Sequence, residues 1–485
     1  MLIALEVDRV QMMNPQVYTT ARSIVVFLAF AAATIAQADI LHSPKVAGLP
    51  ALKVDTVVLK HAVEKRGFVE VPLDYTDPHS PKISIFYRWI PSSRNSSNSK
   101  SKTAPTLVFM NGGPGSDSSY LRTLDYDYSA HPSDSISNLL TVFNIVLVDQ
   151  RGTGNSFPLD QLDGSVELKM IARYLNADAL ALDHAQVINT LLTLGYTAPD
   201  QLYVMAHSFG VSIAWSYIRE LAKGRVSPVP KGLILSAGGV PIAHAEFDLW
   251  LGGRAAQRAF NIGARQYSLD KGLEPFDHLV MRARRHFQDL GFDRSFADFG
   301  SGDMYGGTSA DMYKTVSSLF QFNTREKVIG MLHDPEWSDT FNLISTVLDV
   351  QSCNDNRSNQ DLIVAASHRY PLPDWMEDPL KPLLIQESYN PNRQKELYRL
   401  LKDGGIPSIV LPTAEQTKSV MSKTKILIHY ARGDVTTGWG SAVSYMNQYL
   451  GKDLAKKTIV LTDGPHEVLR TSSEGAHLIR TYFGL

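Results

Sequence analysis

The chain has 485 residues, of which 44% are hydrophobic and 20% are charged, and its formal net charge is -2. This length allows one large domain or two moderate ones, and the composition is that of an ordinary globular protein. A nearly neutral charge gives no reason to expect nucleic acid or an anionic membrane as a partner.

The sequence lacks the common motifs for cofactors and metals. It contains no internal repeat, no Walker motif, no dinucleotide fingerprint and no cysteine–histidine metal spacing. We therefore expect no cofactor and no metal. Cys353 is the single cysteine, so no internal disulfide can form.

The first 38 residues have the pattern of a secretory signal peptide. Residues 23–38 carry no charge and have an apolar centre at 24–33, and Ala36-Gln37-Ala38 is a small-residue cleavage site. A membrane anchor is the alternative, but the run is shorter than the ~20 apolar residues that a span requires. We expect a mature chain that starts near Asp39 and is not held at a membrane. Export without disulfides favours a bacterial periplasmic or extracellular protein.

A buried strand is predicted at 106–110, and the sequence Asn-Gly-Gly-Pro-Gly follows it at 111–115. Glycines directly after a strand allow backbone N–H groups to face a reacting centre. In hydrolases with a nucleophile elbow, one oxyanion donor comes from such a loop, which would here be the N–H of Gly112 or Gly113. An ordinary Gly-Pro turn is the alternative interpretation.

A second apolar strand is predicted at 142–147, and the sequence Val-Asp-Gln-Arg-Gly-Thr-Gly-Asn-Ser follows it at 148–156. The alternative for this segment is a plain strand-to-helix connection held by an Asp–Arg pair.

A third strand, at 201–205, leads into Ala-His-Ser-Phe-Gly at 206–210, and an amphipathic helix is predicted at 211–221. A serine between small residues at such a junction is typical of the nucleophile elbow. This turn raises the hydroxyl of Ser208 above the sheet edge, and the helix amino terminus places the N–H of Phe209 beside it as the second oxyanion donor. On its own, the pattern would also suit a surface turn.

These three segments, in this order, resemble the proline iminopeptidase family of α/β-hydrolase serine peptidases. The family patterns are His-Gly-Gly-Pro-Gly, Asp-Gln-Arg-Gly-x-Gly-x-Ser and Gly-x-Ser-x-Gly, and this chain departs from them at Asn111 and Ala206. Residues 71–86 resemble the opening strands of the secreted tripeptidyl-aminopeptidase-like branch. The resemblance covers 67–239 and the carboxyl end. It implies an α/β-hydrolase fold, with a mostly parallel central sheet flanked by helices and an inserted, mainly helical cap domain.

The alternation of strands and helices stops after a strand near 232–239 and returns at a strand that begins near 425. We therefore expect a signal peptide at 1–38, a first core part at 39–239, a helical cap at 240–418 and a second core part at 419–485. Helical patterns within the expected cap lie at 246–260, 275–290, 309–322 and 325–332. A cap at this place restricts which substrates enter the site.

His466 is the candidate catalytic base. It follows a strand predicted at 458–461 and precedes a final helix predicted at 473–482, whereas the other histidines fit this position less well. His429 lies inside an apolar strand, where a core histidine is expected, and His207 is expected to support the elbow.

Asp434 is the candidate acid. In this fold the nucleophile precedes the acid and the acid precedes the histidine along the chain. Asp434 comes after the strand at 425–430, one strand before the histidine, while the competing acid Asp463 shares the histidine's loop. The predicted catalytic triad is Ser208, Asp434 and His466.

The resemblance implies a secreted serine aminopeptidase that releases amino-terminal proline or short peptides from oligopeptides. Its partner would be a peptide with a free amino terminus, whose ammonium group needs a carboxylate in the cap. Glu246 and Glu387 are the candidates for that carboxylate, with a solvated helix charge as the alternative for each. A carboxylic-ester hydrolase with the same triad and a catalytically silent binding protein remain the competing functions.

Overall fold

The computed structural model describes residues 54–58, 63–92, 104–113, 137–156, 174–242, 262–291, 309–321, 323–325, 327, 410–434, 437–464 and 466–485. The chain divides into two compact units, Met1–Ala51 and Leu52–Leu485, and every described element belongs to the second. The predicted signal peptide and the predicted cap residues Glu246 and Glu387 lie outside the described residues.

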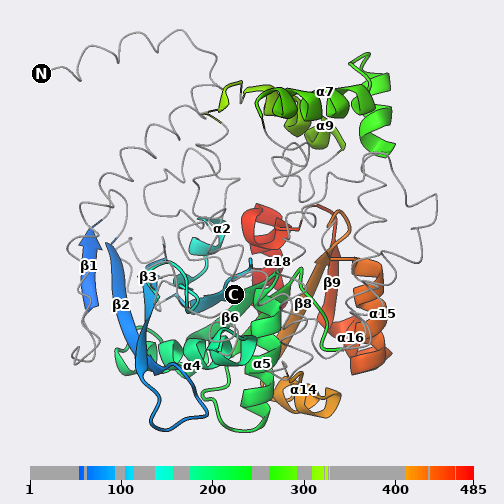
Figure 1. Ribbon diagram of the computed structural model, residues 1–485. Coiled ribbons are helices and arrows are strands. Elements are labelled where there is room, and N and C mark those ends of the chain that lie inside the picture. The colour runs from blue at the N-terminus through cyan, green and yellow to red at the C-terminus, as the bar shows by residue number, and fades with distance from the viewer. Residues whose placement is uncertain are drawn as a thin grey trace, which may run out of the picture. The chain divides into compact units, whose positions relative to one another are not determined.

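Nine strands of the described chain form one sheet in the order β1-β2-β3-β5-β4-β6-β7-β8-β9 (Figure 1). The pairs β1–β2, β2–β3 and β3–β5 are antiparallel, and the other five pairs are parallel. The strands are β1 Val54–Val58, β2 Val63–Pro72, β3 Lys82–Ile90, β4 Thr106–Met110, β5 Asn144–Val148, β6 Leu202–His207, β7 Gly232–Ser236, β8 Lys425–Ala431 and β9 Ile459–Thr462.

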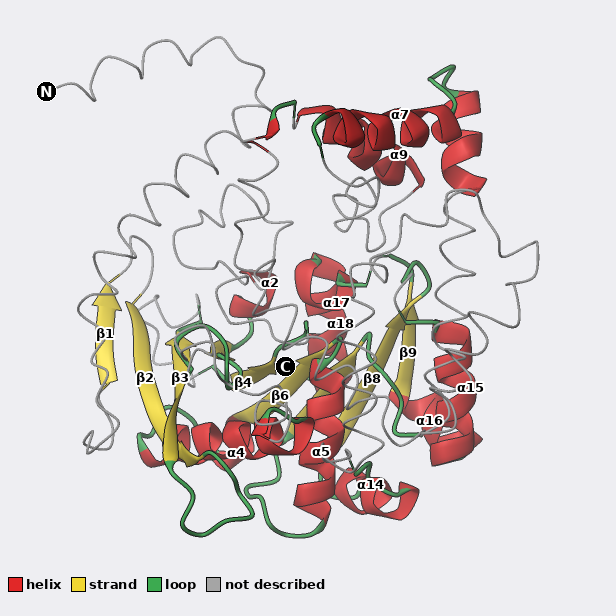
Figure 2. Ribbon diagram, in the orientation of Figure 1, coloured by secondary structure: helices red, strands yellow, loops and turns green. Residues whose placement is uncertain are grey.

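The central strands are apolar along their whole length because both faces of the sheet are covered by helices. In β4, Leu107 and Phe109 enter one hydrophobic cluster, while Val108 and Met110 enter the cluster on the opposite face. The first face packs against α2 (Ser137–Leu140), α17 (Val468–Thr471) and α18 (Ser473–Phe483) (Figure 2). The second packs against α4 (Ala177–Thr193), α5 (Gly210–Ala222), α14 (Ala414–Met421), α15 (Trp439–Leu450) and α16 (Lys452–Thr458).

The strand order reverses at β4. The chain passes from β4 outward to β5 and then crosses back over β4 to β6, so that β4 has β5 on one side and β6 on the other. Ligands of open α/β sheets bind at such a switch point, beyond the carboxyl ends of the strands. The β4–β6 register pairs Met110 with Ala206, so the loop at 111–113 and the turn at Ser208 leave the sheet side by side.

Two further findings concern the segment predicted to be a cap. Helix α7 (Phe276–Asp289), helix α9 (Ser309–Ser318) and the short 3-10 helix η6 (Leu319–Gln321) share a hydrophobic cluster of their own. The predicted division between residues 418 and 419 falls inside α14. This helix packs against α5, and its Val420 belongs to the core cluster.

Candidate active site

Ser208 has a strained backbone. Among the non-glycine residues that the structure describes, Ser208 and Ala237 have a positive φ, which is 54° for both. Such a conformation costs about 1–3 kcal/mol and persists where the surroundings enforce it. Here the backbone N–H of Ser208 donates to the carbonyl of Ser236 at 2.9 Å, and α5 begins two residues later at Gly210. The serine therefore stands on a sharp strand-to-helix turn.

Glycines make this turn possible because other backbone passes very close to it. A Cβ on Gly210 would lie 2.1 Å from the carbonyl oxygen of Met110, and one on Gly238 would lie 2.6 Å from that of Ser208. A Cβ on Gly112 would lie 3.0 Å from Ser208 Cβ and 3.6 Å from Ser208 Oγ. The loop after β4 therefore lies directly against the serine.

The structure brings Asp434 and His466 together. Asp434 follows β8 and is fully buried, and His466 follows β9 and is 5% exposed. His466 Nδ1 and Asp434 Oδ2 are 2.8 Å apart, and the backbone N–H of Thr437 donates to the other carboxylate oxygen, Oδ1, at 2.9 Å. A carboxylate on Nδ1 holds the proton there and leaves Nε2 as the proton acceptor. Thr437 was not predicted from the sequence, because its contact with Asp434 is made by its backbone alone.

The surroundings of His466 favour the protonated form of its imidazole, although burial opposes it. Burial, the largest contribution, lowers the pKa of its imidazole, but the charge of Asp434 and the hydrogen bond to it raise that pKa above its ordinary value of 6.5. The His466 ring lies 4.8 Å, centre to centre, from the ring of His207, the residue before Ser208. His466 thus lies close to the turn that carries Ser208.

The two other histidines near the site are held neutral. Burial is the main reason that the pKa of His207 lies well below 6.5, and His466 and Arg470 lower it further. Burial likewise lowers the pKa of His429 to about 4. His429 is fully buried, and its Nε2 is 2.8 Å from Thr462 Oγ1 in β9. His429 is therefore a core histidine with a hydrogen-bond partner, as the sequence predicted.

The remaining predicted site residues are placed as follows. Gly113 has a φ of 109° in the loop after β4, and Phe209 is the buried residue that directly precedes α5. Asp463, the competing acid, has an 87% exposed side chain that pairs with Arg432 at 2.8 Å. Glu246 and Glu387, as stated above, are not described.

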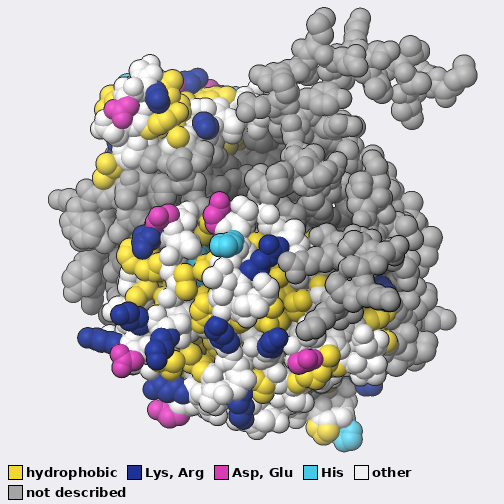
Figure 3. All heavy atoms as spheres, turned by 180° about the vertical axis from the view of Figure 1, so that it is seen from behind, with side chains coloured by type: hydrophobic (Ala, Val, Ile, Leu, Met, Phe, Trp, Pro, Cys, Tyr) yellow, Lys and Arg dark blue, Asp and Glu magenta, His cyan; other side chains and the backbone are white. Residues whose placement is uncertain are grey.

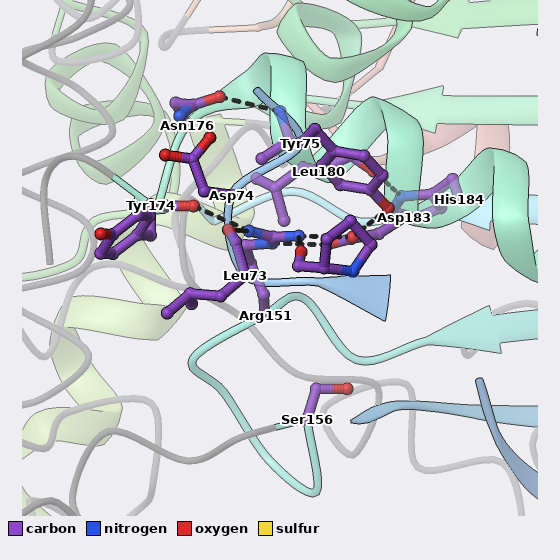
Figure 4. A network of polar contacts seen from close by, with 12 residues as sticks. Leu73, Asp74, Tyr75, Arg151, Ser156, Tyr174, Asn176, Leu180, Asp183 and His184 are labelled. Carbon is purple, nitrogen blue, oxygen red and sulfur yellow. Dashed lines mark hydrogen bonds and ion pairs between the residues drawn. The ribbon is translucent and has the colours of Figure 1, made fainter. Parts of the chain in front are cut away.

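The segment 149–156 is held by a buried ion pair. Arg151 Nε and Nη2 donate to the two carboxylate oxygens of Asp183 on α4 at 2.7 and 2.6 Å, and Nη1 donates to the carbonyls of Leu73 and Tyr174 (Figure 4). The Tyr75 hydroxyl also donates to Asp183, at 2.8 Å, and its pKa is raised by burial and by that carboxylate. The sequence predicted an Asp–Arg pair as one alternative, but it did not identify Asp183 as the partner of Arg151. An acidic residue on the apolar side of a predicted helix is the signal that could have identified it.

Replacing Asp183 with alanine should lower the free energy of unfolding by about 3–5 kcal/mol, since the buried guanidinium of Arg151 would lose its carboxylate. Both side chains of the pair are 2% exposed, so water cannot replace the lost partner. Urea unfolding measures the loss, with the exposed Asp200→Ala as the control, which should change stability by less than about 0.5 kcal/mol. Equal losses in the two variants would refute this view of the pair.

On the face seen in Figure 3, Lys and Arg side chains are dispersed among hydrophobic and uncharged ones. In the described ranges, no three His, Cys, Asp or Glu side chains are grouped so that they could hold a metal ion. No described helix is both long and apolar enough to cross a membrane.

Comparisons with known proteins gave the following results. No protein-family model matches the chain, and no curated protein matches it significantly. A meta-cleavage product hydrolase from Pseudomonas fluorescens is 12% identical, with a TM-score of 0.33 and coverage of 83% of this chain and 94% of that one. An epoxide hydrolase from Acinetobacter nosocomialis is 12% identical, with a TM-score of 0.34 and coverage of 90% and 91%. A prohormone-processing carboxypeptidase from Saccharomyces cerevisiae is 11% identical, with a TM-score of 0.33 and coverage of 78% and 76%.

The fold follows from the arrangement of the strands and helices in the described part of the chain. An antiparallel edge leads into a parallel sheet whose order reverses at β4, and helices cover both faces. A serine with positive φ stands between β6 and α5, and an Asp–His pair follows the last two strands. The chain therefore has the α/β-hydrolase fold that the sequence predicted.

Proposed function

We propose that the protein is a serine hydrolase in which Ser208 is the nucleophile, His466 the general base and Asp434 the orienting acid. The observation that carries the proposal is the buried 2.8 Å contact between His466 Nδ1 and Asp434 Oδ2, with the His466 ring 4.8 Å from the ring of His207, which directly precedes the strained Ser208. Strain of this kind and a histidine oriented by a carboxylate are features of nucleophilic active sites.

The mechanism follows from these positions. Nε2 of His466 takes the proton of the Ser208 hydroxyl as the serine oxygen attacks the substrate carbonyl carbon. The carbonyl electrons move onto its oxygen, and Asp434 stabilises the imidazolium that forms. His466 then gives its proton to the leaving group, and the acyl-enzyme remains. Water, activated by the same imidazole, attacks the acyl-enzyme and releases Ser208.

The oxyanion of each tetrahedral intermediate needs donors that are already in place. The backbone N–H of Phe209, at the start of α5, and the N–H of Gly112 or Gly113 are the proposed donors. A single donor of this kind is worth roughly 2.7–4 kcal/mol of transition-state stabilisation. None of these steps calls on a metal or a cofactor.

We further propose that the substrate is a peptide with a free amino terminus, cleaved to release proline or a short peptide. The resemblance of the three motifs to proline iminopeptidases supports this substrate class. Export, inferred from residues 1–38, is part of the same proposal. Glu246 and Glu387 stay candidates for binding the substrate ammonium.

The substrate class is tested by comparing free and acetylated forms of proline 4-nitroanilide and of a tripeptide 4-nitroanilide. Acetylation removes a charged hydrogen bond worth about 1.5–3 kcal/mol, so kcat/KM should fall roughly 10- to 150-fold. 4-Nitrophenyl acetate serves as the ester control. Equal rates on free and acetylated anilides, or turnover of the ester alone, would contradict the aminopeptidase and favour the ester hydrolase.

The rate should also depend on pH through His466. Only the neutral imidazole can accept the Ser208 proton, so kcat/KM should fall as pH drops through the pKa of His466 in the free enzyme. Because Asp434 raises that pKa above 6.5, the acid limb of the profile should have its midpoint above pH 6.5. In Asp434→Asn the raising interactions are lost and burial remains, so the midpoint should move to lower pH. A midpoint that stays in place in this variant would contradict the assignment.

A further inference from the structure

Gln150 contacts the loop that lies against Ser208. It comes two residues after the end of β5 and is 1% exposed. Its side-chain Nε2 donates to the carbonyl oxygen of Asn111 at 3.0 Å and to that of Gly112 at 3.3 Å. One buried amide thus holds two successive peptide groups of a glycine loop that has few side chains to restrain its backbone.

These contacts determine where two N–H groups point. In a trans peptide the C=O and the N–H lie in one plane and point in opposite directions. The carbonyl of Asn111 shares its plane with the N–H of Gly112, and the carbonyl of Gly112 shares its plane with the N–H of Gly113. By binding both carbonyls, Gln150 turns both N–H groups away from itself. Gly112 is the residue whose Cβ, if added, would lie 3.0 Å from Ser208 Cβ.

Gln150 is itself held firmly. Its carbonyl accepts hydrogen bonds from the backbone N–H of Thr153 at 3.0 Å and from Thr153 Oγ1 at 2.7 Å. On one side, the backbone N–H of Asp149 donates to the carbonyl of Phe86 at 3.1 Å. On the other side, Arg151 is anchored to Asp183 (Figure 4). The amide therefore extends from a rigid turn.

We propose that Gln150 is a positioning residue for the oxyanion hole, where it holds the carbonyls of Asn111 and Gly112 so that the N–H groups of Gly112 and Gly113 face the substrate oxygen. This inference rests on the proposed serine-hydrolase function. The oxyanion exists only during the reaction, so the contribution of Gln150 belongs to the transition state and not to substrate binding. The role also explains why a polar side chain is buried directly beside a glycine loop.

The test measures how fast a fluorophosphonate labels Ser208, because the phosphonyl oxygen occupies the oxyanion hole whatever the natural substrate is. Gln150→Met keeps the length of the side chain and removes the donor. Its labelling rate should fall about 10- to 100-fold, somewhat less than the roughly 10²- to 10³-fold cost of removing a donor outright. On any reporter that the wild type cleaves, kcat should fall by a similar factor while KM changes less than about twofold. The exposed Gln186→Glu on α4 is the control and should behave as wild type.

A second variant keeps the test decisive if Gln150→Met does not fold. In Gln150→Glu the introduced carboxyl can donate to the Asn111 carbonyl only while it is protonated. The ratio of its labelling rate to that of wild type should therefore rise as pH is lowered from 10 to 6. A merely structural role would leave this ratio flat.

The outcomes separate the two proposals. If the wild type is not labelled at Ser208, the serine-hydrolase proposal fails. If the wild type is labelled and Gln150→Met reacts within about twofold of its rate, this inference alone is overturned. A flat ratio for Gln150→Glu overturns it in the same way.

Discussion

Replacing Ser208 with alanine should reduce kcat by roughly 10⁶-fold, the loss that removal of a nucleophilic serine causes in a comparable triad. The turn that carries Ser208 is set by its surroundings, including the hydrogen bond of its backbone N–H to Ser236 and the close approach of Gly210 to Met110. The variant should therefore fold as the wild type does. Turnover of the best anilide, together with the urea midpoint, measures both effects.

Two comparisons make this result specific. Ser212 lies in the first turn of α5, and its backbone N–H donates to the Phe209 carbonyl. Ser212→Ala removes only the side-chain hydroxyl, so kcat should stay within about twofold of the wild-type value. His466→Ala should cost about as much as Ser208→Ala, and the double variant should cost no more than either alone, because the groups act as one unit. Additive losses in the double variant would show that the two residues do not work together.

Replacing Asp434 with asparagine should reduce kcat by roughly 10⁴-fold, because the wrong histidine tautomer would form. The backbone N–H of Thr437 donates to Asp434 Oδ1 and would hold the asparagine carbonyl in that position. The asparagine NH₂ would then face His466 Nδ1 and donate to it. The proton of the neutral imidazole would move to Nε2, which could no longer accept the proton of Ser208.

Asp463→Asn is the matched control, since Asp463 is the other acid that the sequence allowed. Its exposed carboxylate pairs with Arg432, so its loss should change kcat by less than about twofold. A large loss in Asp463→Asn together with a small one in Asp434→Asn would reverse the assignment of the acid.

Short-range patterns in the sequence were enough to predict the centre of the fold. The strand at 106–110 was predicted with the bounds that β4 has, and the continuous apolar run of β8 was recognised at 425–430. Buried parallel strands are apolar on both faces, so their signal lies in a few consecutive residues. The small residues around Ser208 likewise carry the signal of the elbow within one short segment.

Other boundaries depend on local hydrogen bonds that composition does not reveal. Thr458 was predicted to be the first residue of the last strand. In the structure it ends α16, and its Oγ1 donates to the carbonyl of Leu454 at 2.7 Å. Gln201 was predicted within the third strand but belongs to a 3-10 turn, η4 (Pro199–Gln201), which Pro199 opens.

Contacts between distant segments were the hardest to predict. Arg151 and Asp183 are 32 positions apart, and nothing near Arg151 in the sequence indicates that its partner lies on α4. The same holds for Gln150, whose amide bonds to carbonyls 39 and 38 positions away. The Gln150 contacts arise because β4 and β5 are neighbours in the sheet, which the order of residues along the chain does not reveal.

The most direct measurement of the catalytic unit is mass-spectrometric mapping of the site that a fluorophosphonate modifies. We expect one adduct, on the serine at position 208, that forms far more slowly when Asp434 is asparagine or His466 is alanine. An adduct on a different serine, the absence of any adduct, or labelling at an unchanged rate in those two variants would contradict it.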